Sequence, residues 1–440
     1  MRREAPVSDA EVLLAVHEGA VAARIERTGE RLTLRYEPDW RSRGPFPLSL
    51  SLPLASREHD SARVHAFLSN LLPDNAAVLE SWGKRFRVSS RSPFKLLTHV
   101  GQDCAGAFAF LPPEALEAHR SQPGKVRWLD EAEIEDRLAT LRTDAGSWRR
   151  DDDEGQFSLA GAQAKIALLA QDGRWGIPSG RTPTTHILKP AIPGFDGHVE
   201  NEHFCLVLAR ELGLSTARSE VGRFGAESAI VVERYDRAVD VTHGQPPRVV
   251  RLHQEDLCQA LGVRPERKYQ NDGGPIVPEI AALLRARSRD ASGDLERFRD
   301  ALLFQWLIAG TDAHAKNYSL VHGAGGRVQL APLYDVASAL PYPHLNAPKR
   351  KLAMKMGRTY RLRDIGRAEI EQMAADLGLD RRVTVDRAGE LAAHLPAAAR
   401  SVQVRRVAGT QNPFVEALRA KLEARAAQCA SRLDGPGATA

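Results

Sequence analysis

An apolar run that ends in a compact group of polar residues constrains this chain more than any other feature. The stretch 302–337 reads LLFQWLIAGTDAHAKNYSLVHGAGGRVQLAPLYDVA. Its first seven residues are apolar except for Gln305, and the polar part follows at Thr311–Asn317. A glycine-rich turn at 323–326 then leads into a second apolar segment that reaches Asp335. Apolar segments of this kind are usually buried, so the polar side chains are expected at the edge of a core.

The spacing within this stretch is typical of a phosphoryl-transfer site. Asp312 and Asn317 are five positions apart, as are the Asp and Asn of a protein-kinase catalytic loop. Asp335 follows one hairpin later, where a second magnesium-binding Asp would lie. This chemistry needs a carboxylate to deprotonate the attacking hydroxyl and oxygen ligands for magnesium, and Lys316 is suited to neutralise charge on the transferring group. For each residue alone, a surface loop remains the alternative, because Asp and Asn are common in turns.

Length and composition limit the remaining possibilities. With 440 residues, 43% of them hydrophobic and 27% charged, the chain is expected to form two or three globular domains. No apolar stretch approaches the roughly 20 residues of a membrane span, and the N-terminus lacks the apolar segment of a secretory signal. The four cysteines form no C-x-x-C pair, so free thiols of a cytosolic protein are expected. The net charge of +5 permits a nucleic-acid partner without requiring one.

The first part of the chain, 1–112, is predicted to be a small α+β domain. Residues 11–37 indicate a meander of short strands, and 45–55 indicate another strand. Helices are expected in 62–82, with a break at 72–75, and around 93–99. We interpret this part as a structural or partner-binding module, because nothing in it looks catalytic.

Residues 113–236 are predicted to contain a connector and a nucleotide-binding lobe. The connector has one amphipathic helix, at 129–141, and an acidic loop at 151–155. A strand, a glycine loop and a second strand then follow and could cover a nucleotide, and the next strand, 184–190, carries a lysine that could reach its phosphates. The chain lacks G-x-x-x-x-G-K-[ST], which disfavours a Walker A NTPase.

The next helix begins with two acids, Glu200 and Glu202, where a kinase places the glutamate that pairs with its strand lysine. Either acid would equally complement the helix dipole, so the choice stays open. Residues 228–235 form a buried strand that corresponds to the adenine-contacting hinge between two lobes. The remainder, 237–440, is expected to be mainly helical. Within it, 349–363 holds seven Lys or Arg and is either a docking face or a solvated hairpin.

Taken together, motifs along the whole length resemble those of the HipA-type serine/threonine kinases, which are toxins of bacterial type II toxin–antitoxin pairs. The motifs are PLSLSLPL (47–54), FLSNLLPDN (67–75), VGQDCAGA (100–107), SLAGAQAK (158–165), TTHILKP (184–190), ENEHFCLVLARELGL (200–214), VVERYDR (231–237), RLHQEDLCQALG (251–262), KYQNDGGP (268–275), GTDAHAKNYSL (310–320) and APLYDVASALPY (331–342). The resemblance implies an α+β, protein-kinase-like, two-lobed fold, with a small N-terminal α+β subdomain and a mostly helical C-terminal lobe.

The resemblance also implies roles for individual residues. Asp312 would be the catalytic base, Asn317 and Asp335 the magnesium ligands, and Lys189 the contact to the ATP phosphates. Ser158 occupies the position of the autophosphorylated serine of this family, where about −2 charge beside an anion-binding loop would repel ATP. A serine without a regulatory role is the alternative for Ser158. The remaining implied nucleotide contacts are the phosphate loop (Ala160, Gly161, Ala162, Gln163, Ala164, Lys165), the hinge (Glu233, Tyr235, where many relatives have Phe) and the phosphate-proximal or loop-stabilising His314.

The resemblance further implies partners and an effect on the cell. HipA-like toxins phosphorylate an aminoacyl-tRNA synthetase, glutamyl-tRNA synthetase in the best-known branch, and thereby cause growth arrest or persistence. They pair with a small helix-turn-helix antitoxin of the HipB type, and the complex binds operator DNA. Candidate DNA contacts are Arg381, Arg382 and the basic segment 349–363. No membrane partner is expected.

Three other functions are compatible with parts of the pattern. A small-molecule kinase would share the catalytic pair but would lack the N-terminal 112 residues. A non-enzymatic corepressor would bind only an antitoxin and operator DNA. A metal-dependent hydrolase using Asp312, His314 and Asp335 is the weakest alternative, because no second histidine lies nearby in the sequence.

Overall fold

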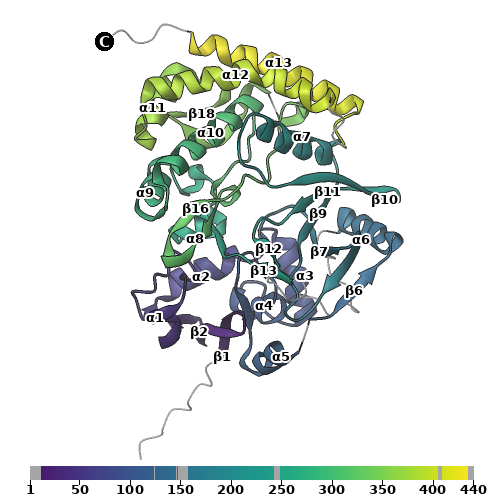
Figure 1. Cartoon of the computed structure of the whole chain (residues 1–440), viewed down its shortest axis with the longest axis vertical. Coiled ribbons are helices and arrows are strands. Elements are labelled where there is room, and N and C mark those ends of the chain that lie inside the picture. Colours follow the sequence, from purple (N-terminus) through teal and green to yellow (C-terminus); the bar gives the residue numbers. More distant parts are fainter. Residues whose placement is uncertain are drawn as a thin grey trace, which may run out of the picture.

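A computed structural model describes residues 11–122, 124–144, 146, 157–241, 248–345, 347–404 and 409–434. The chain begins at a strand-rich end and finishes at a helical end, with a second sheet between them (Figure 1). Helices and strands are mixed throughout, which confirms the predicted α+β class. The acidic loop expected at 151–155 lies outside the described residues.

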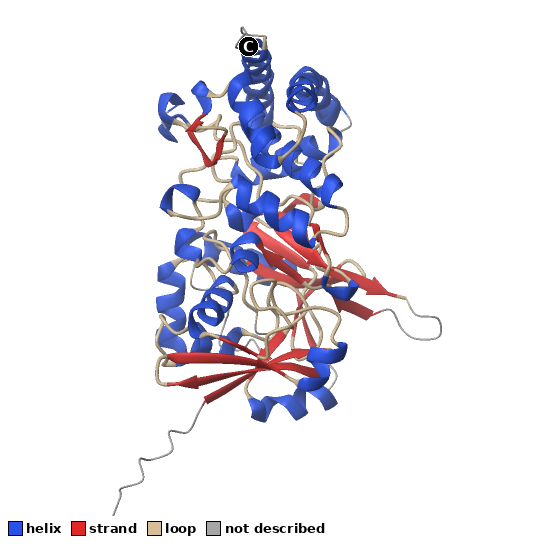
Figure 2. Cartoon of the chain, turned by 90° about the vertical axis from the view of Figure 1, so that its left-hand side faces the viewer, coloured by secondary structure: helices blue, strands red, loops and turns tan. Residues whose placement is uncertain are grey.

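The strand-rich end is a five-stranded antiparallel sheet with the order β4-β3-β2-β1-β5. The first three strands confirm the meander expected at 11–37, and helices α2 and α3, separated at 71–75, confirm the expected helical break. The elements are β1 (Glu11–His17), β2 (Ala20–Thr28), β3 (Arg31–Tyr36), α1 (Pro38–Arg43), β4 (Glu58–His59), α2 (Ser61–Asn70), α3 (Ala76–Phe86), α4 (Pro93–Val100) and β5 (Ala109–Leu111). We call this part the N-terminal unit. Figure 2 shows its strands crossing one end of the molecule.

The prediction of a strand at 45–55 is wrong. The segment forms turns, with a single bridge between Ser49 and Leu52. Prolines in this segment remove backbone donors that a strand would use. The apolar residues are buried all the same, since Leu48 and Leu52 are fully enclosed. The alternating hydrophobicity of this segment therefore indicated correctly that its apolar side chains are buried, but it did not indicate strand pairing.

The middle of the molecule is a six-stranded sheet with the order β10-β11-β9-β7-β8-β6. Its elements are β6 (Val126–Leu129), β7 (Ile166–Gln171), β8 (Arg174–Pro178), β9 (His186–Pro190), β10 (Ser219–Phe224) and β11 (Glu227–Glu233), with helices α5 (Leu116–Ser121) and α6 (Glu131–Thr143) before β7 and helix α7 (His198–Glu211) after β9. Leu129, expected in the connector helix, belongs instead to β6. The strand expected before the glycine loop is reduced to one bridge between Phe157 and Asp103.

The helical end is organised around α10 (Ala291–Ile308), which carries the apolar run of the sequence. Phe304 and Trp306 are fully buried in it, as expected. The other elements are β12 (Arg237–Asp240), β13 (Arg248–Arg251), β14 (Gln254–Asp256), α8 (Leu257–Leu261), α9 (Val277–Arg287), β15 (Ser319–His322), β16 (Val328–Leu330), β17 (Lys351–Met356), β18 (Thr359–Arg361), α11 (Arg367–Leu377), α12 (Arg381–Val404) and α13 (Pro413–Leu433). The expectation of a mainly helical C-terminal part is confirmed.

The N-terminal unit is joined to the rest of the chain by buried polar contacts, not only by apolar packing. The Ser49 hydroxyl donates to Glu255 Oε2 at 2.5 Å, and Lys316 Nζ donates to Asn70 Oδ1 at 2.8 Å. Arg237 donates to Asp103 Oδ1 at 2.8 Å. Each contact pairs a residue of one sequence motif in the N-terminal unit with a residue far along the chain.

The basic segment 349–363 forms the β17–β18 hairpin. It packs beside the loop at 270–272, where the Lys355 amide donates to Gln270 Oε1 at 2.7 Å. Arg381 and Arg382 are exposed at the start of α12. Within the described residues, no helix combines the length and the apolar character that a membrane crossing requires.

Candidate active site

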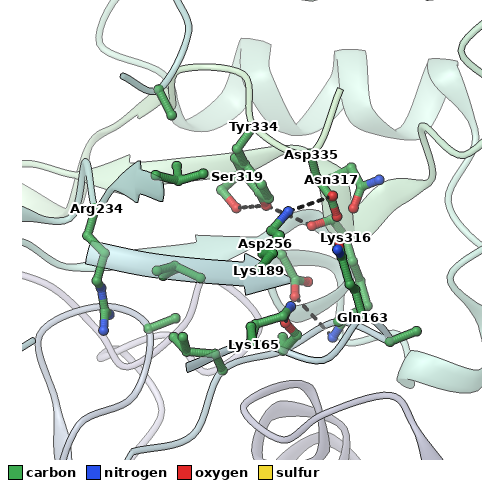
Figure 3. A pocket seen from close by; sticks show the side chains of 18 of the residues that line it. Gln163, Lys165, Lys189, Arg234, Asp256, Lys316, Asn317, Ser319, Tyr334 and Asp335 are labelled. Carbon is green, nitrogen blue, oxygen red and sulfur yellow. Dashed lines mark hydrogen bonds and ion pairs between the residues drawn. The ribbon is translucent and has the colours of Figure 1, made fainter. Parts of the chain in front are cut away.

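A cavity of about 430 Å³ lies between the six-stranded sheet and the helical end, and its volume is in the range of small-molecule sites. All three parts of the chain contribute to its wall. Figure 3 shows Asn317 and Asp335 together on one side of the pocket, with Lys165 across from them. The lining includes Asn70, Ala105, Ala160, Gly161, Ala162, Gln163, Lys165, Lys189, Glu202, Glu233, Tyr235, Asp256, Lys268, Asp312, His314, Lys316, Asn317, Tyr334 and Asp335.

Lys189, on β9, bridges two carboxylates of the pocket. Its Nζ lies 2.8 Å from Glu202 Oε1 and 2.8 Å from Asp335 Oδ1. Burial alone would lower the pKa of this lysine, but the two carboxylates outweigh it and hold the pKa above its ordinary value. Glu202 is fully buried on α7, whereas Glu200 is not among the cavity residues. The choice that the sequence left open is therefore resolved in favour of Glu202.

The loop after α10 arranges Asp312 and Asn317 around one turn. The helix ends with Ala309 in the left-handed conformation (φ 54°), which turns the chain toward the cavity. The Asp312 carbonyl then accepts from the side chain of Asn317 at 2.8 Å and from the His314 amide at 2.8 Å. The five-residue spacing thus closes a compact loop that presents both side chains to the cavity.

The Asp312 carboxylate is engaged by a residue that the sequence did not single out. Tyr269 donates its hydroxyl to Asp312 Oδ1 at 2.6 Å, and its ring packs edge-on against His314. Limited hydration raises the pKa of Asp312, although the Tyr269 hydrogen bond acts in the opposite direction. Burial lowers the pKa of His314 to about 4, so this ring is neutral at physiological pH. Only the motif KYQNDGGP, which contains Tyr269, could have pointed to this contact.

Asp335 and Asn317 are suited to hold magnesium against bound phosphates. Asp335 has a left-handed backbone (φ 58°), uncommon for a residue other than glycine and frequent at functional sites. Partial burial would raise its pKa, but Lys189 and Lys165 hold it below the ordinary range. Among the described residues, no group of three or more His, Cys, Asp or Glu side chains forms a metal site. Mg²⁺ in phosphoryl-transfer sites needs only one or two protein ligands besides phosphate oxygens and water, so this pair fits.

The glycine loop at 160–165 covers one side of the cavity. Gly161 has φ +107°, a backbone conformation that other residues rarely adopt, so the position favours glycine. A Cβ added there would lie 2.5 Å from Lys165 Nζ, the end of a flexible side chain that could move aside. Lys165 donates to the carbonyl of Ala160 at 2.6 Å, and Gln163 donates to the Pro190 carbonyl at 3.3 Å. Ala164 lies within the loop but outside the cavity lining. Burial and the nearby Lys189 lower the pKa of Lys165 to about 8.

The residues expected to form the hinge, Glu233 and Tyr235, lie where β11 ends. Glu233 is exposed at the cavity rim, and its amide donates to the Arg218 carbonyl. Tyr235 donates its hydroxyl to Gln254 Oε1 at 2.7 Å, with its ring 5.8 Å from that of Tyr334. Between them, Arg234 is buried and points into the protein, where it contacts Asp236 and Asp103. The end of β11 is thereby anchored to the N-terminal unit.

Ser158 is not brought into the cavity. It is fully buried, and its hydroxyl donates to the Leu71 carbonyl at 2.7 Å. Its amide donates to the Asp103 carbonyl at 3.1 Å. A phosphate could reach this hydroxyl only after the segment that carries it has left its present position.

Comparisons with known proteins agree in coverage and fold. A family model described as HipA N-terminal domain matches residues 13–111, and one described as HipA-like C-terminal domain matches 157–399. The chain is 37% identical over 366 residues to the candidate kinase Y4mE of Sinorhizobium fredii, a match that covers 80% of this chain and 83% of that protein. It is 30% identical over 388 residues to the serine/threonine-protein kinase toxin HipA of Shewanella oneidensis, covering 85% and 84%. A chain in the solved complex of Shewanella oneidensis HipA, HipB and operator DNA superposes with a TM-score of 0.81 and 27% identity, covering 96% of this chain and 98% of that chain.

Proposed function

Because the chain belongs to the HipA family of kinases, we propose that it is an ATP-dependent serine/threonine protein kinase and the toxin of a toxin–antitoxin pair. One observation carries this proposal. The side chains that phosphoryl transfer requires come from four separate elements and surround one cavity of suitable size. They are Lys189 on β9, Glu202 on α7, Asp312 and Asn317 after α10, and Asp335 after β16.

In the proposed reaction, each side chain has a defined task. Asp312 accepts the proton of the attacking hydroxyl, and Lys189, held by Glu202, contacts the nucleotide phosphates. Asn317 and Asp335 would hold Mg²⁺, which would neutralise phosphate charge when bound. The loop Ala160–Lys165 covers the phosphates, while Glu233 and Tyr235 line the end of the cavity proposed for adenine. The neutral His314 supports the loop through Tyr269.

We further infer the partners from the relatives. The named activity of the Shewanella oneidensis protein supports a protein substrate, for which an aminoacyl-tRNA synthetase, glutamyl-tRNA synthetase first, is the proposed candidate. Its complex with HipB and operator DNA supports a helix-turn-helix antitoxin and an operator as partners of this chain. Inhibited translation with growth arrest would be the result of substrate phosphorylation.

The proposal is tested by incubating the purified chain with radiolabelled Mg-ATP and measuring its intact mass. We expect the wild type to gain one phosphate, at Ser158, and the Ser158→Ala variant to gain none while still labelling a protein in bacterial lysate. Labelling of the lysate would then be narrowed with purified synthetases. If neither the chain nor any lysate protein is labelled, although antitoxin and operator are bound, the corepressor function replaces the kinase. Transfer to small aminoalcohols or antibiotics alone would instead identify a small-molecule kinase.

Replacing Glu202 with Gln should weaken the nucleotide site. The variant leaves Lys189 with Asp335 alone, so the ammonium shifts toward the latter, and we expect kcat/KM for ATP to fall about 10- to 100-fold. Glu200→Gln is the matched control, because Glu200 begins the same helix without lining the cavity, and it should change kcat/KM less than twofold. Equal effects of the two variants would contradict the assignment. Steady-state rates at varied ATP concentration provide the measurement.

A further inference from the structure

A buried charge cluster lies directly behind the catalytic loop and includes residues of the N-terminal unit. Asp74 lies in the turn between α2 and α3, with Oδ2 2.8 Å from Lys268 Nζ and Oδ1 3.4 Å from Lys316 Nζ. The Lys316 ammonium also lies 3.3 Å from Asp256 Oδ2 and 2.8 Å from Asn70 Oδ1. We call these five residues the Asp74 cluster. Two lysines and two aspartates balance its charge.

Asp74 is the member of this cluster that does not line the cavity. Its side chain is 7% exposed, and that of Lys316 is 2% exposed. Burial would raise the pKa of Asp74, but Lys316 and Lys268 outweigh it and hold the pKa below its ordinary value. The carboxylate is therefore charged at neutral pH, and ion pairs in such an environment are screened little by salt.

The backbone around Asp74 also reaches the glycine loop. Pro73 forms a parallel bridge with Gly161, and the Asp74 amide donates to the Gly161 carbonyl at 3.1 Å. One turn of the N-terminal unit thus contacts the glycine loop through its main chain and the catalytic loop through a side chain. The third contact, to Lys268, reaches the residue next to Tyr269, which itself donates to Asp312.

Lys316 transmits this contact to the residues proposed to hold magnesium. It directly precedes Asn317, and its ammonium is fixed by the Asp74 cluster. Its carbonyl accepts a hydrogen bond from the Tyr334 hydroxyl at 2.7 Å, and Tyr334 directly precedes Asp335. Figure 3 shows Lys316, Asn317, Tyr334 and Asp335 grouped in this way. A shift of Lys316 would therefore displace both oxygen ligands together.

We propose that Asp74 is a positioning residue for phosphoryl transfer, so that the N-terminal unit is a required part of the kinase active site. The inference rests on the proposed kinase function. Asp74 acts through Lys316 and Lys268 without touching substrate. A misplacement of reacting groups by about 1 Å can cost about 10²-fold in rate, so loss of this carboxylate should be visible in turnover even if the fold is retained.

The experiment compares Asp74→Asn with the wild type, with casein as acceptor and radiolabelled Mg-ATP. We expect the rate at saturating ATP to fall about 10- to 100-fold, while binding of a fluorescent ATP analogue without Mg²⁺ changes less than threefold. Mg²⁺ should strengthen analogue binding to the wild type more than to the variant. The Mg²⁺ concentration for half-maximal rate should rise. A residue that only tied two domains together would leave both magnesium readouts unchanged.

Two control variants test whether an effect of Asp74→Asn comes from the place of this carboxylate. One removes a carboxylate elsewhere, and the other weakens the contact between the N-terminal unit and the rest of the chain. Asp39→Asn removes an exposed carboxylate of the N-terminal unit. Ser51→Ala removes another contact between the N-terminal unit and the rest of the chain, the 2.7 Å hydrogen bond from Ser51 to the Gln259 carbonyl. Both should retain the wild-type rate within twofold. If Asp74→Asn does not fold, as judged by thermal unfolding, Asn70→Ala removes a second support of Lys316 and should lower the rate about 3- to 10-fold.

Distinct results overturn the two proposals. If the wild type labels neither casein, itself nor any lysate protein, the proposed kinase function is wrong. If the wild type is active and Asp74→Asn stays within twofold of it in rate and in magnesium dependence, the proposed role of Asp74 is wrong and the kinase function stands. A Ser51→Ala variant as impaired as Asp74→Asn would also overturn the inference, because the effect would then belong to docking in general.

Discussion

Asp312→Asn is expected to reduce phosphate transfer by about 10²- to 10⁴-fold, the range that a positioned general base contributes. The amide cannot accept the proton of the attacking hydroxyl, although it has nearly the same shape as the carboxylate. Its oxygen can still accept from Tyr269, and the Asp312 carbonyl still accepts from the Asn317 side chain, so the loop should be retained. Labelling of the chain and of casein with radiolabelled Mg-ATP gives the rate.

Nucleotide binding distinguishes loss of chemistry from loss of structure in this variant. Because Lys189, Glu202 and Asp335 are unaltered, the affinity for a fluorescent ATP analogue should stay within threefold of the wild type. Asp364→Asn, which removes a carboxylate that is 44% exposed and paired with Arg363, is the control and should transfer phosphate normally. A variant at Asp312 that retains more than about a tenth of the wild-type rate would show that another group takes the proton.

The compact shape of the loop that holds Asp312 and Asn317, the proposed catalytic loop, could be predicted from the sequence because its geometry is local. Five positions separate Asp312 from Asn317, and a turn of that length closes on itself through the hydrogen bond between them. The order of strand lysine, acidic helix and hinge was equally readable, since each element follows the previous one along the chain. The sequence could not show which acid of the helix pairs with the lysine. Glu200 and Glu202 have the same chemistry, and only the packing of α7 shows which of them faces Lys189.

Contacts between segments far apart in the chain could not be predicted from the sequence. The N-terminal unit was interpreted as having no catalytic part, yet Asn70 and Ala105 line the cavity. Asn70 and Lys316 are 246 positions apart, and nothing in either local pattern indicates the other. Tyr269 was missed for the same reason, because its partner Asp312 lies 43 positions away. Buried polar residues of this kind match a partner that the fold supplies, so local propensity gives no signal for them.

The same long-range pairing makes Asp103 a position where a single change should cost much stability. This aspartate of the N-terminal unit is 5% exposed and is contacted by three arginines, Arg234, Arg237 and Arg251. It also accepts from the amide and the hydroxyl of Thr184 at 3.0 and 2.6 Å. Asp236 is the other carboxylate contacted by the first two arginines. Removal of Asp103 therefore leaves Arg234 and Arg237 to share Asp236, and takes from Arg251 the carboxylate that it contacts.

Asp103→Asn should lower the free energy of unfolding by about 3–5 kcal/mol, the usual cost of breaking a buried ion pair from one side. Asp39→Asn, in an exposed pair, should change it by about 0–1 kcal/mol. Urea unfolding followed by tryptophan fluorescence measures both free energies of unfolding.

The contribution of Asp103 to stability should also depend on pH. Burial would raise the pKa of Asp103, but the arginines hold it well below the ordinary value in the folded state. In the unfolded chain the carboxyl takes up a proton near pH 3.9, so the contribution is complete above that pH and is lost as the pH falls below it. The stability difference between wild type and Asp103→Asn should accordingly narrow below about pH 4. A difference that is under 1 kcal/mol at pH 7, or that stays constant as the pH falls, would contradict the argument that paired charge joins the N-terminal unit to the hinge.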